Sequence, residues 1–216
     1  MSFLIEAYER IRKEISGKNI ILVAVTKTKP VSDIMEAYNA GHRDFGENYV
    51  QELVDKHEAL PKDIRWHYIG HLQTNKVKYI VPFIHLIHGV DSEKLLSEIN
   101  KQAAKINRNT GCLLQVHISG EETKFGMNEK ELTALTDKIL TNPAPWKNVT
   151  IKGFMGMASL TEDNARIRSE FKYLRSVFDR TDYNLLSMGM SSDYRLAIDE
   201  GSNMIRIGSL LFGARN

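Results

Sequence analysis

The sequence predicts an α/β fold: a single-domain (β/α)8 TIM barrel spanning residues 1–216. Short apolar runs alternate with longer amphipathic stretches eight times, and such alternation indicates a parallel sheet. The 216 residues leave about 27 for each unit, which is near the lower limit for this barrel and gives no room for a second domain. An open doubly wound sheet is the structural alternative, because the second strand is weak by pattern alone.

Strands are expected at short apolar runs that turn residues bound. Residues 20–25 (IILVAV) form a continuous apolar run with β-branched side chains, which is typical of a parallel strand buried on both faces. The short run 44–47 is the weakest of the eight. The others are predicted at 66–70, 83–90, 112–118, 151–157, 184–190 and 203–209.

Helices are expected in the amphipathic stretches between these runs. Asn128 followed by Glu131 has the spacing of a capping box, and Asp91 is expected to cap the helix after residues 83–90. The stretch after residue 157 carries apolar side chains at helical spacing. The earlier helices are predicted over 2–16, over 31–40, up to about Leu60 and just before Pro82, and a short late helix is expected to close at Gly201.

Composition excludes several functional classes. The 29 basic and 27 acidic residues give a net charge of +2 without a block of like charge, so the footprint of a nucleic-acid binder is missing. No apolar run reaches the ~18 residues of a membrane span. The single cysteine, Cys112, excludes an intrachain disulfide and is expected to be an inert core thiol. We therefore expect a soluble cytoplasmic protein without a nucleic-acid or membrane partner.

Candidate functional residues are the polar residues that follow each strand, because barrels carry their sites at that end. Lys27 directly follows an apolar strand, where desolvation would lower the pKa of its amine and allow a Schiff base with a carbonyl. A solvated lysine at a strand end is the alternative. The other candidates are Glu47, Asn48, His71, Lys124, Ser191 and Arg206 through Ser209.

The last two units suggest an anion site. Residues 191–193 (SSD) can cap the helix after the seventh strand, and Gly208 with Ser209 opens the final turn. Free backbone N–H groups at such turns bind phosphate, and barrels often place phosphate there. The nucleotide-binding patterns GxxxxGK[ST] and GxGxxG are absent.

Arg206 lies inside the apolar run MIRIG and needs a partner. It could donate to a ring nitrogen or an anion of a ligand, or it could pair with a carboxylate such as Glu47. No metal site is expected, because His67 and His71 straddle a strand end and His85 and His88 face opposite ways on a strand.

The sequence repeats one short pattern. Met155-Gly156-Met157 and Met188-Gly189-Met190 each end a predicted strand. Flexible core packing is favoured over a binding role for both.

Five motifs in register resemble the pyridoxal phosphate homeostasis protein family. They match from residue 20 to the C-terminus, in the same order as in that family. The resemblance implies a barrel of the alanine racemase N-terminal type, without that enzyme's C-terminal β domain. The motifs are AVTKTKP (24–30), FGENYVQE (45–52), WHYIGHLQTNK (66–76), MGMSSD (188–193) and RIGSLLFGAR (206–215).

The resemblance also implies the cofactor and its contacts. Pyridoxal 5′-phosphate (PLP) would form an aldimine with Lys27, Asn48 would line the ring and Arg206 would face the pyridine nitrogen. The phosphate would contact Ser191, Gly208 and Ser209. The loop 121–128 (EETKFGMN) matches the family more loosely, and its Lys124-Phe125-Gly126 could lie near the cofactor.

The implied function is PLP buffering or delivery in vitamin B6 homeostasis, without a catalytic residue and without turnover. PLP-dependent apoenzymes are possible recipients, and a monomer is expected because the dimerising domain is missing. One alternative is an amino-acid racemase or lyase of weak activity, in which His71 or Tyr49 could supply a second acid/base group. The others are a barrel that binds another phosphorylated metabolite and an interaction scaffold that binds no ligand.

Overall fold

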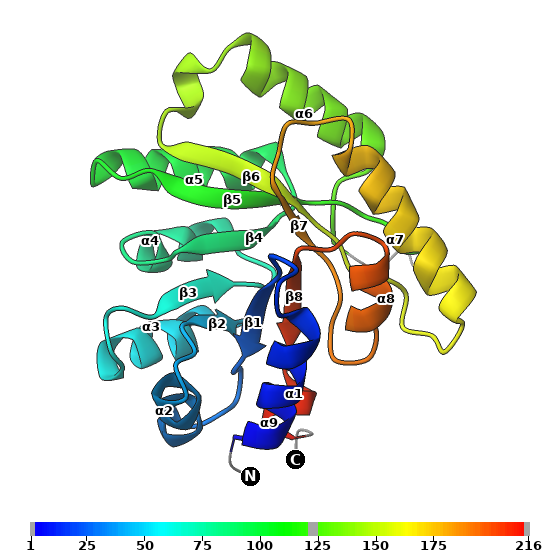
Figure 1. Ribbon diagram of the computed structural model, residues 1–216. Helices are drawn as coiled ribbons and strands as arrows, with labels where there is room; N and C mark the ends of the chain where they lie inside the picture. The colour runs from blue at the N-terminus through cyan, green and yellow to red at the C-terminus, as the bar shows by residue number, and fades with distance from the viewer. Residues whose placement is uncertain (1–2, 121–124, 214–216) are drawn as a thin grey trace.

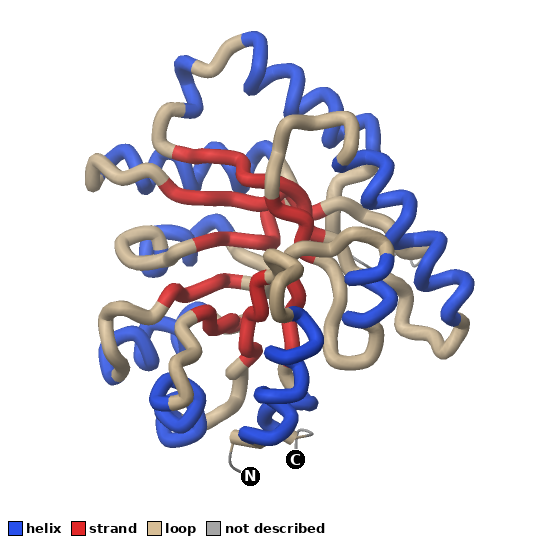
Figure 2. The backbone as a smooth tube through the Cα atoms, viewed as in Figure 1, coloured by secondary structure: helices blue, strands red, loops and turns tan. Residues whose placement is uncertain are grey.

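The computed structural model describes residues 3–120 and 125–213. Its strands close into one barrel in the order β1 to β8, and helices surround the barrel (Figures 1 and 2). The closing pair is β1 with β8, which lie parallel from Ile21 beside Met204 to Ala24 beside Ile207. This closure confirms the predicted (β/α)8 barrel and excludes the open sheet.

Each predicted strand is present, with bounds that differ by a few residues. The weak second strand is paired with both of its neighbours, and its Gly46 packs closely, since an added Cβ would lie 2.9 Å from the Val23 side chain. The strands are β1 (Ile21–Val25), β2 (Asp44–Glu47), β3 (Arg65–Tyr68), β4 (Leu86–Val90), β5 (Thr110–Gln115), β6 (Val149–Met155), β7 (Leu185–Ser187) and β8 (Met204–Ile207).

The helices follow the strands as expected. After an initial helix, the chain returns along the outside of the barrel between successive strands, and two short 3-10 turns join them. The helical elements are α1 (Ile5–Ile15), α2 (Val31–Asn39), α3 (Val50–Ala59), η1 (Thr74–Lys76), α4 (Val77–Ile80), α5 (Glu93–Lys105), α6 (Glu129–Thr141), η2 (Ala144–Trp146), α7 (Asn164–Phe178), α8 (Tyr194–Asp199) and α9 (Ser209–Phe212).

Two predictions about helix starts have different outcomes. Asn128 and Glu131 form the predicted capping box at α6. The prediction that Asp91 caps α5 is wrong: the cap is Ser92, whose hydroxyl accepts from the Leu95 amide at 3.3 Å. Asp91 turns instead toward His71, 3.0 Å from its Nδ1. A helix accepts either residue as its cap, so only the neighbouring loop decided between them.

The apolar core has two parts. The larger lies between the sheet and the helices, and a smaller cluster fills the barrel interior with Val23, Leu86, Leu113, Met155 and Met204. Cys112 is buried as predicted, and burial raises the pKa of its thiol to about 12. Among the described residues, no helix is both long enough and apolar enough to span a membrane.

Candidate cofactor site

Lys27 follows β1 by two residues and is half-buried at the carboxyl end of the barrel. Its neighbour Thr28 has φ 63°, a left-handed conformation that is rare for a β-branched residue. Such a conformation persists only where the surroundings hold it. The backbone that carries the Lys27 amine is therefore fixed by other contacts.

Those contacts come from a buried charged network on β2 and α3. Lys56 donates from Nζ to the Thr26 carbonyl at 2.7 Å, to Glu47 Oε1 at 2.7 Å and to Glu52 Oε1 at 2.6 Å. Glu52 also accepts from the Thr28 amide at 2.6 Å. Both residues that flank Lys27 are thus bound to this network.

Burial dominates the electrostatics of Glu47. The side chain has no exposed surface, and burial raises its pKa to about 7, although Lys56 opposes the change. Its Oε1 accepts from the Thr26 hydroxyl at 2.6 Å as well as from Lys56. Glu47 therefore belongs to the support of the Lys27 loop.

Asn48 directly follows β2 and is half-buried. Its backbone carbonyl accepts from the Tyr68 hydroxyl at 2.8 Å, and Gly70 packs so closely that an added Cβ would lie 2.6 Å from the same carbonyl. Its side-chain Oδ1 is buried and has no hydrogen-bond partner among the described residues. A buried amide oxygen without a partner is costly and is a candidate ligand contact.

Arg206 lies in the middle of β8 and is 4% exposed. Its Nη1 donates to Ser187 Oγ at 2.6 Å, and its Nη2 donates to the Gly156 carbonyl at 3.1 Å. Burial lowers the pKa of the guanidinium to about 10, which leaves it cationic at neutral pH. The alternative that Arg206 pairs with Glu47 is wrong, because the Glu47 carboxylate on β2 binds Lys56 of α3 instead.

The two Met-Gly-Met segments converge on Arg206. The Gly156 carbonyl accepts from its side chain, and the Gly189 carbonyl accepts from its backbone amide at 3.0 Å. Met155 and Met188 are buried, as core packing predicts. Gly189 is also required sterically, since it has φ +97° and an added Cβ would lie 2.6 Å from Ala197. The first methionine of each segment therefore packs in the core, while the glycine carbonyls accept hydrogen bonds from Arg206.

Ser191, Gly208 and Ser209 lie at the same end of the barrel. The Gly208 amide donates to Ser191 Oγ at 3.1 Å, which joins the loops after β7 and β8. An added Cβ on Gly208 would meet Val25 at 3.4 Å, an ordinary contact, so internal packing does not demand glycine there. Ser209 begins α9 and is exposed.

The predicted cap of α8 is only partly present. Asp193 is the residue before the helix, but its Oδ1 accepts from the Met190 amide at 2.5 Å, and its side chain does not cap α8. Its carboxylate fixes the turn in front of the helix. Asp193 also supports the charge of Arg206 electrostatically.

The remaining candidates lie around this end of the barrel. His71 stacks on Phe125 with ring centroids 4.0 Å apart and lies 3.0 Å from Asp91. Tyr49 is 54% exposed. Lys124 falls outside the described residues. Lys29, which could have been a solvated lysine, donates from Nζ to the Phe212 carbonyl at 2.6 Å and so ties the Lys27 loop to α9.

The histidines do not gather around a metal position. Among residues 3–120 and 125–213, no group of three or more His, Cys, Asp or Glu side chains could hold one. His85 precedes β4 and His88 lies within it, and both rings lie against His67, with ring centroids 5.3 and 5.2 Å from its own. Sequence reasoning missed that His88 pairs with His67, 2.9 Å apart.

Comparisons with known proteins decide the family. The model of the alanine racemase N-terminal domain matches residues 4–216. The pyridoxal phosphate homeostasis protein of Aquifex aeolicus is 42% identical over 96% of this chain and 94% of its own. This chain belongs to the pyridoxal phosphate homeostasis protein family.

Solved structures agree with that assignment. PipY of Synechococcus elongatus, determined with PLP bound, is 34% identical with a TM-score of 0.86 and covers 96% of this chain and 99% of its own. Alanine racemase of Bartonella henselae is 18% identical with a TM-score of 0.75 and covers 97% of this chain but 62% of its own. The racemase supports the fold alone.

The residues present fit the cofactor of this family. PLP has an aldehyde, a ring nitrogen that accepts hydrogen bonds and a phosphate. The carboxyl end of the barrel offers a primary amine on Lys27, a cationic donor on Arg206 and the hydroxyls of Ser191 and Ser209. The buried Asn48 Oδ1 adds a polar atom that has no protein partner among the described residues.

Proposed function

We propose that this protein binds PLP and serves in its intracellular homeostasis, as a buffer or carrier without turnover of its own. The observation that carries the proposal is that the Lys27 side chain and the Arg206 guanidinium both lie at the carboxyl end of the barrel. The proposal draws further support from the relatives named for PLP homeostasis and from PipY, whose structure has PLP bound.

Lys27 is the proposed covalent anchor. Its amine nitrogen adds to the aldehyde carbon, one water leaves, and a C=N bond forms. Lys56 and Glu52 keep the residues on both sides of Lys27 in place, so the backbone that carries the side chain of Lys27 is held at the carboxyl end of the barrel. Because the bond reverses by the uptake of water or exchange with another amine, the same anchor allows release.

The other contacts are assigned by their chemistry. Arg206 donates toward the ring nitrogen, Asn48 lines the ring, and Ser191, Gly208 and Ser209 bind the phosphate. Bound PLP supplies an electron sink that is strong only when its ring nitrogen is protonated. Arg206 carries only donors and disfavours that protonation, so this site is suited to holding the cofactor rather than to carbanion chemistry.

The setting and partners are part of the same proposal. The cytoplasm, a monomeric state and PLP-dependent apoenzymes as recipients are predictions from the sequence and its resemblance. A racemase or lyase would need an acid/base group opposite Lys27. Of the two candidates for it, His71 lies 3.0 Å from Asp91, and Tyr49 is 54% exposed.

An absorption spectrum of the purified protein with PLP, followed by borohydride reduction and peptide mapping, tests the proposal. We expect an imine band whose reduced product maps to Lys27. Lys27→Ala should lose the band and keep the fold, whereas the control Lys18→Ala, at an exposed lysine before β1, should keep the band. A wild-type protein that stays unlabelled contradicts PLP binding and favours another phosphorylated ligand. Turnover of amino acids would favour the enzyme instead.

A further inference from the structure

A continuous line of polar side chains crosses the barrel interior. Asp44 Oδ1 lies 3.0 Å from His67 Nε2, and His67 Nδ1 lies 2.9 Å from His88 Nε2. His88 Nδ1 lies 3.1 Å from Ser187 Oγ, which accepts from Arg206 Nη1 at 2.6 Å. The side chains come from β2, β3, β4, β7 and β8. We call these five residues the interior chain.

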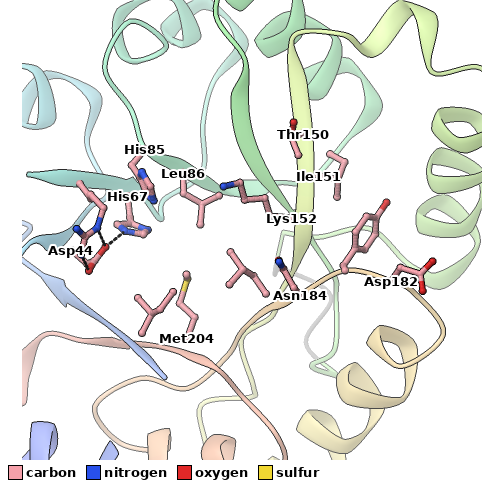
Figure 3. A pocket seen from close by; sticks show the side chains of 14 residues that line it. Asp44, His67, His85, Leu86, Thr150, Ile151, Lys152, Asp182, Asn184 and Met204 are labelled. Atoms are coloured by element: carbon pink, nitrogen blue, oxygen red, sulfur yellow. Dashed lines mark hydrogen bonds and ion pairs between the residues drawn. The ribbon is translucent and has the colours of Figure 1, made fainter. Parts of the chain in front are cut away.

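The interior chain joins the two ends of the barrel. Asp44 begins β2, whereas Ser187 ends β7, and the bond between His88 and Ser187 connects strands that are not neighbours in the sheet. Asp44 and His67 border a cavity of about 500 Å³ at the amino ends of the strands, where Figure 3 shows them joined. Arg206 lies at the other end of the line.

With both imidazoles neutral, the carboxylate at one end sets the direction of each hydrogen bond, and the guanidinium at the other end is compatible with it. Arginine only donates, and an ionised carboxylate only accepts. Burial opposes ionisation of Asp44, but hydrogen bonds from His67 and Arg65 outweigh it and hold the pKa of Asp44 below its usual range. His67 therefore donates from Nε2 to Asp44, and a neutral His67 must accept at Nδ1 from His88 Nε2.

The same logic continues to Arg206. A neutral His88 that donates from Nε2 accepts at Nδ1, so the Ser187 hydroxyl donates to His88 and its oxygen accepts from Arg206. Every bond is satisfied with both imidazoles neutral. Burial lowers the pKa of His88 well below its usual value, and the cationic Arg206 and the rings of His67 and His85 act in the same direction.

We propose that the interior chain is a positioning device, in which Asp44, through His67, His88 and Ser187, orients the Arg206 guanidinium toward the cofactor site. Arg206 donates to Ser187 and to the Gly156 carbonyl with two of the five N–H groups of its guanidinium, which leaves donors for a ligand. The role assigned to Arg206 rests on the proposed function, whereas the direction of the hydrogen bonds along the interior chain does not rest on it.

The first test measures the tautomers of both histidines by ¹⁵N NMR in the protein without PLP, at neutral pH. We expect His67 and His88 to be neutral with the proton on Nε2. A proton on Nδ1, or a cationic ring, in either residue overturns the proposal. This measurement remains decisive if the protein binds no PLP, an outcome that would contradict the proposed function only.

The second test measures PLP affinity by absorbance titration in Ser187→Ala and Asp44→Asn. Ser187→Ala removes the acceptor of Arg206, and we expect the Kd to rise roughly tenfold, the size of one hydrogen bond to a charged group. Asp44→Asn can donate as well as accept, so it removes the fixed direction. We expect a severalfold rise in Kd and a mixture of tautomers at His67.

Two controls separate this role from general damage. Asp63→Asn removes another carboxylate two residues before β3, outside the interior chain, where it pairs with Arg43. Lys138→Gln removes the cation of an exposed pair with Glu93, which also lies outside the interior chain. Both should keep the Kd within twofold and the tautomers unchanged. If Asp44→Asn behaves like Asp63→Asn in both measurements, the proposal is wrong.

Discussion

The two basic side chains of the candidate site, Lys27 and Arg206, are supported in opposite ways. The loop of Lys27 is held by charges, with Lys56 between the carboxylates of Glu47 and Glu52 at 2.7 and 2.6 Å. Arg206 is held by neutral groups, the Ser187 hydroxyl and the Gly156 carbonyl. One side of the barrel therefore uses ion pairs and the other uses dipoles.

The difference follows from what each cation does in the proposed function. The Lys27 amine must lose its charge to react, and the charged network holds the backbone on both sides of it. Arg206 must keep its charge and its direction. A buried carboxylate beside it would take up its donors, whereas a hydroxyl and a carbonyl fix the guanidinium and use few of them.

The largest expected effect is on the charged side. Lys56→Met leaves Glu47 buried without its cation and should destabilise the protein by about 3–5 kcal/mol. Urea unfolding measures this loss. Lys56→Met combined with Glu47→Leu should regain most of it, because apolar replacement of a whole buried pair is often neutral. A free energy of unfolding of Lys56→Met within 1 kcal/mol of wild type would show that the Lys56 network does not stabilise the β2 and α3 side of the barrel.

The pH dependence of stability sharpens the comparison. Burial raises the pKa of Glu47 from 4.5 to about 7, so the folded protein binds this proton more tightly than the unfolded chain does. Its stabilising contribution is complete below pH 4.5 and is lost as the pH rises through 7, by roughly 3 kcal/mol at most. Glu47→Gln should flatten the curve of unfolding free energy over this range. An unchanged slope would contradict the assignment to Glu47.

On the neutral side the cost of removing the cation should be smaller. Arg206→Met leaves the Ser187 hydroxyl and the Gly156 carbonyl without their donor, whereas the buried Asp193 carboxylate keeps its hydrogen bond from the Met190 amide. We therefore expect a loss of about 1–3 kcal/mol. The measurement is again urea unfolding, beside Lys56→Met. A greater loss in Arg206→Met than in Lys56→Met would reverse the comparison.

The smallest effect is expected at the Thr28 amide. Glu52→Gln replaces a charged acceptor with a neutral one and should change stability by about 1 kcal/mol, while slowing the reaction of Lys27 with PLP as its loop loosens. Stopped-flow absorbance measures the rate. Glu58→Gln, an exposed change on the same helix, is the control. Equal rates in both variants would mean that Glu52 does not hold the loop.

Local pattern predicted most of the fold and the rim residues of the site. The strand at 20–25 and the capping box at Asn128 are set by neighbours in the sequence, and both are present. Lys27, Asn48 and Arg206 remain predicted site residues, and the signals for them were their places after a predicted strand or inside an apolar run. Lys56 was missed, although its place between Leu53 and Leu60, at helical spacing on the buried side of α3, was a readable signal.

The sequence by itself determined the eight alternating units, the barrel and the polar residues at the strand ends, because these depend on periodicity and on chain neighbours. Only the tertiary structure decided the partners of Arg206 and of the interior histidines. His88 and Ser187 are 99 residues apart, and barrel closure alone brings them within 3.1 Å. Which buried polar groups meet is a property of the closed barrel, since each must find its partner across the barrel interior rather than along the chain.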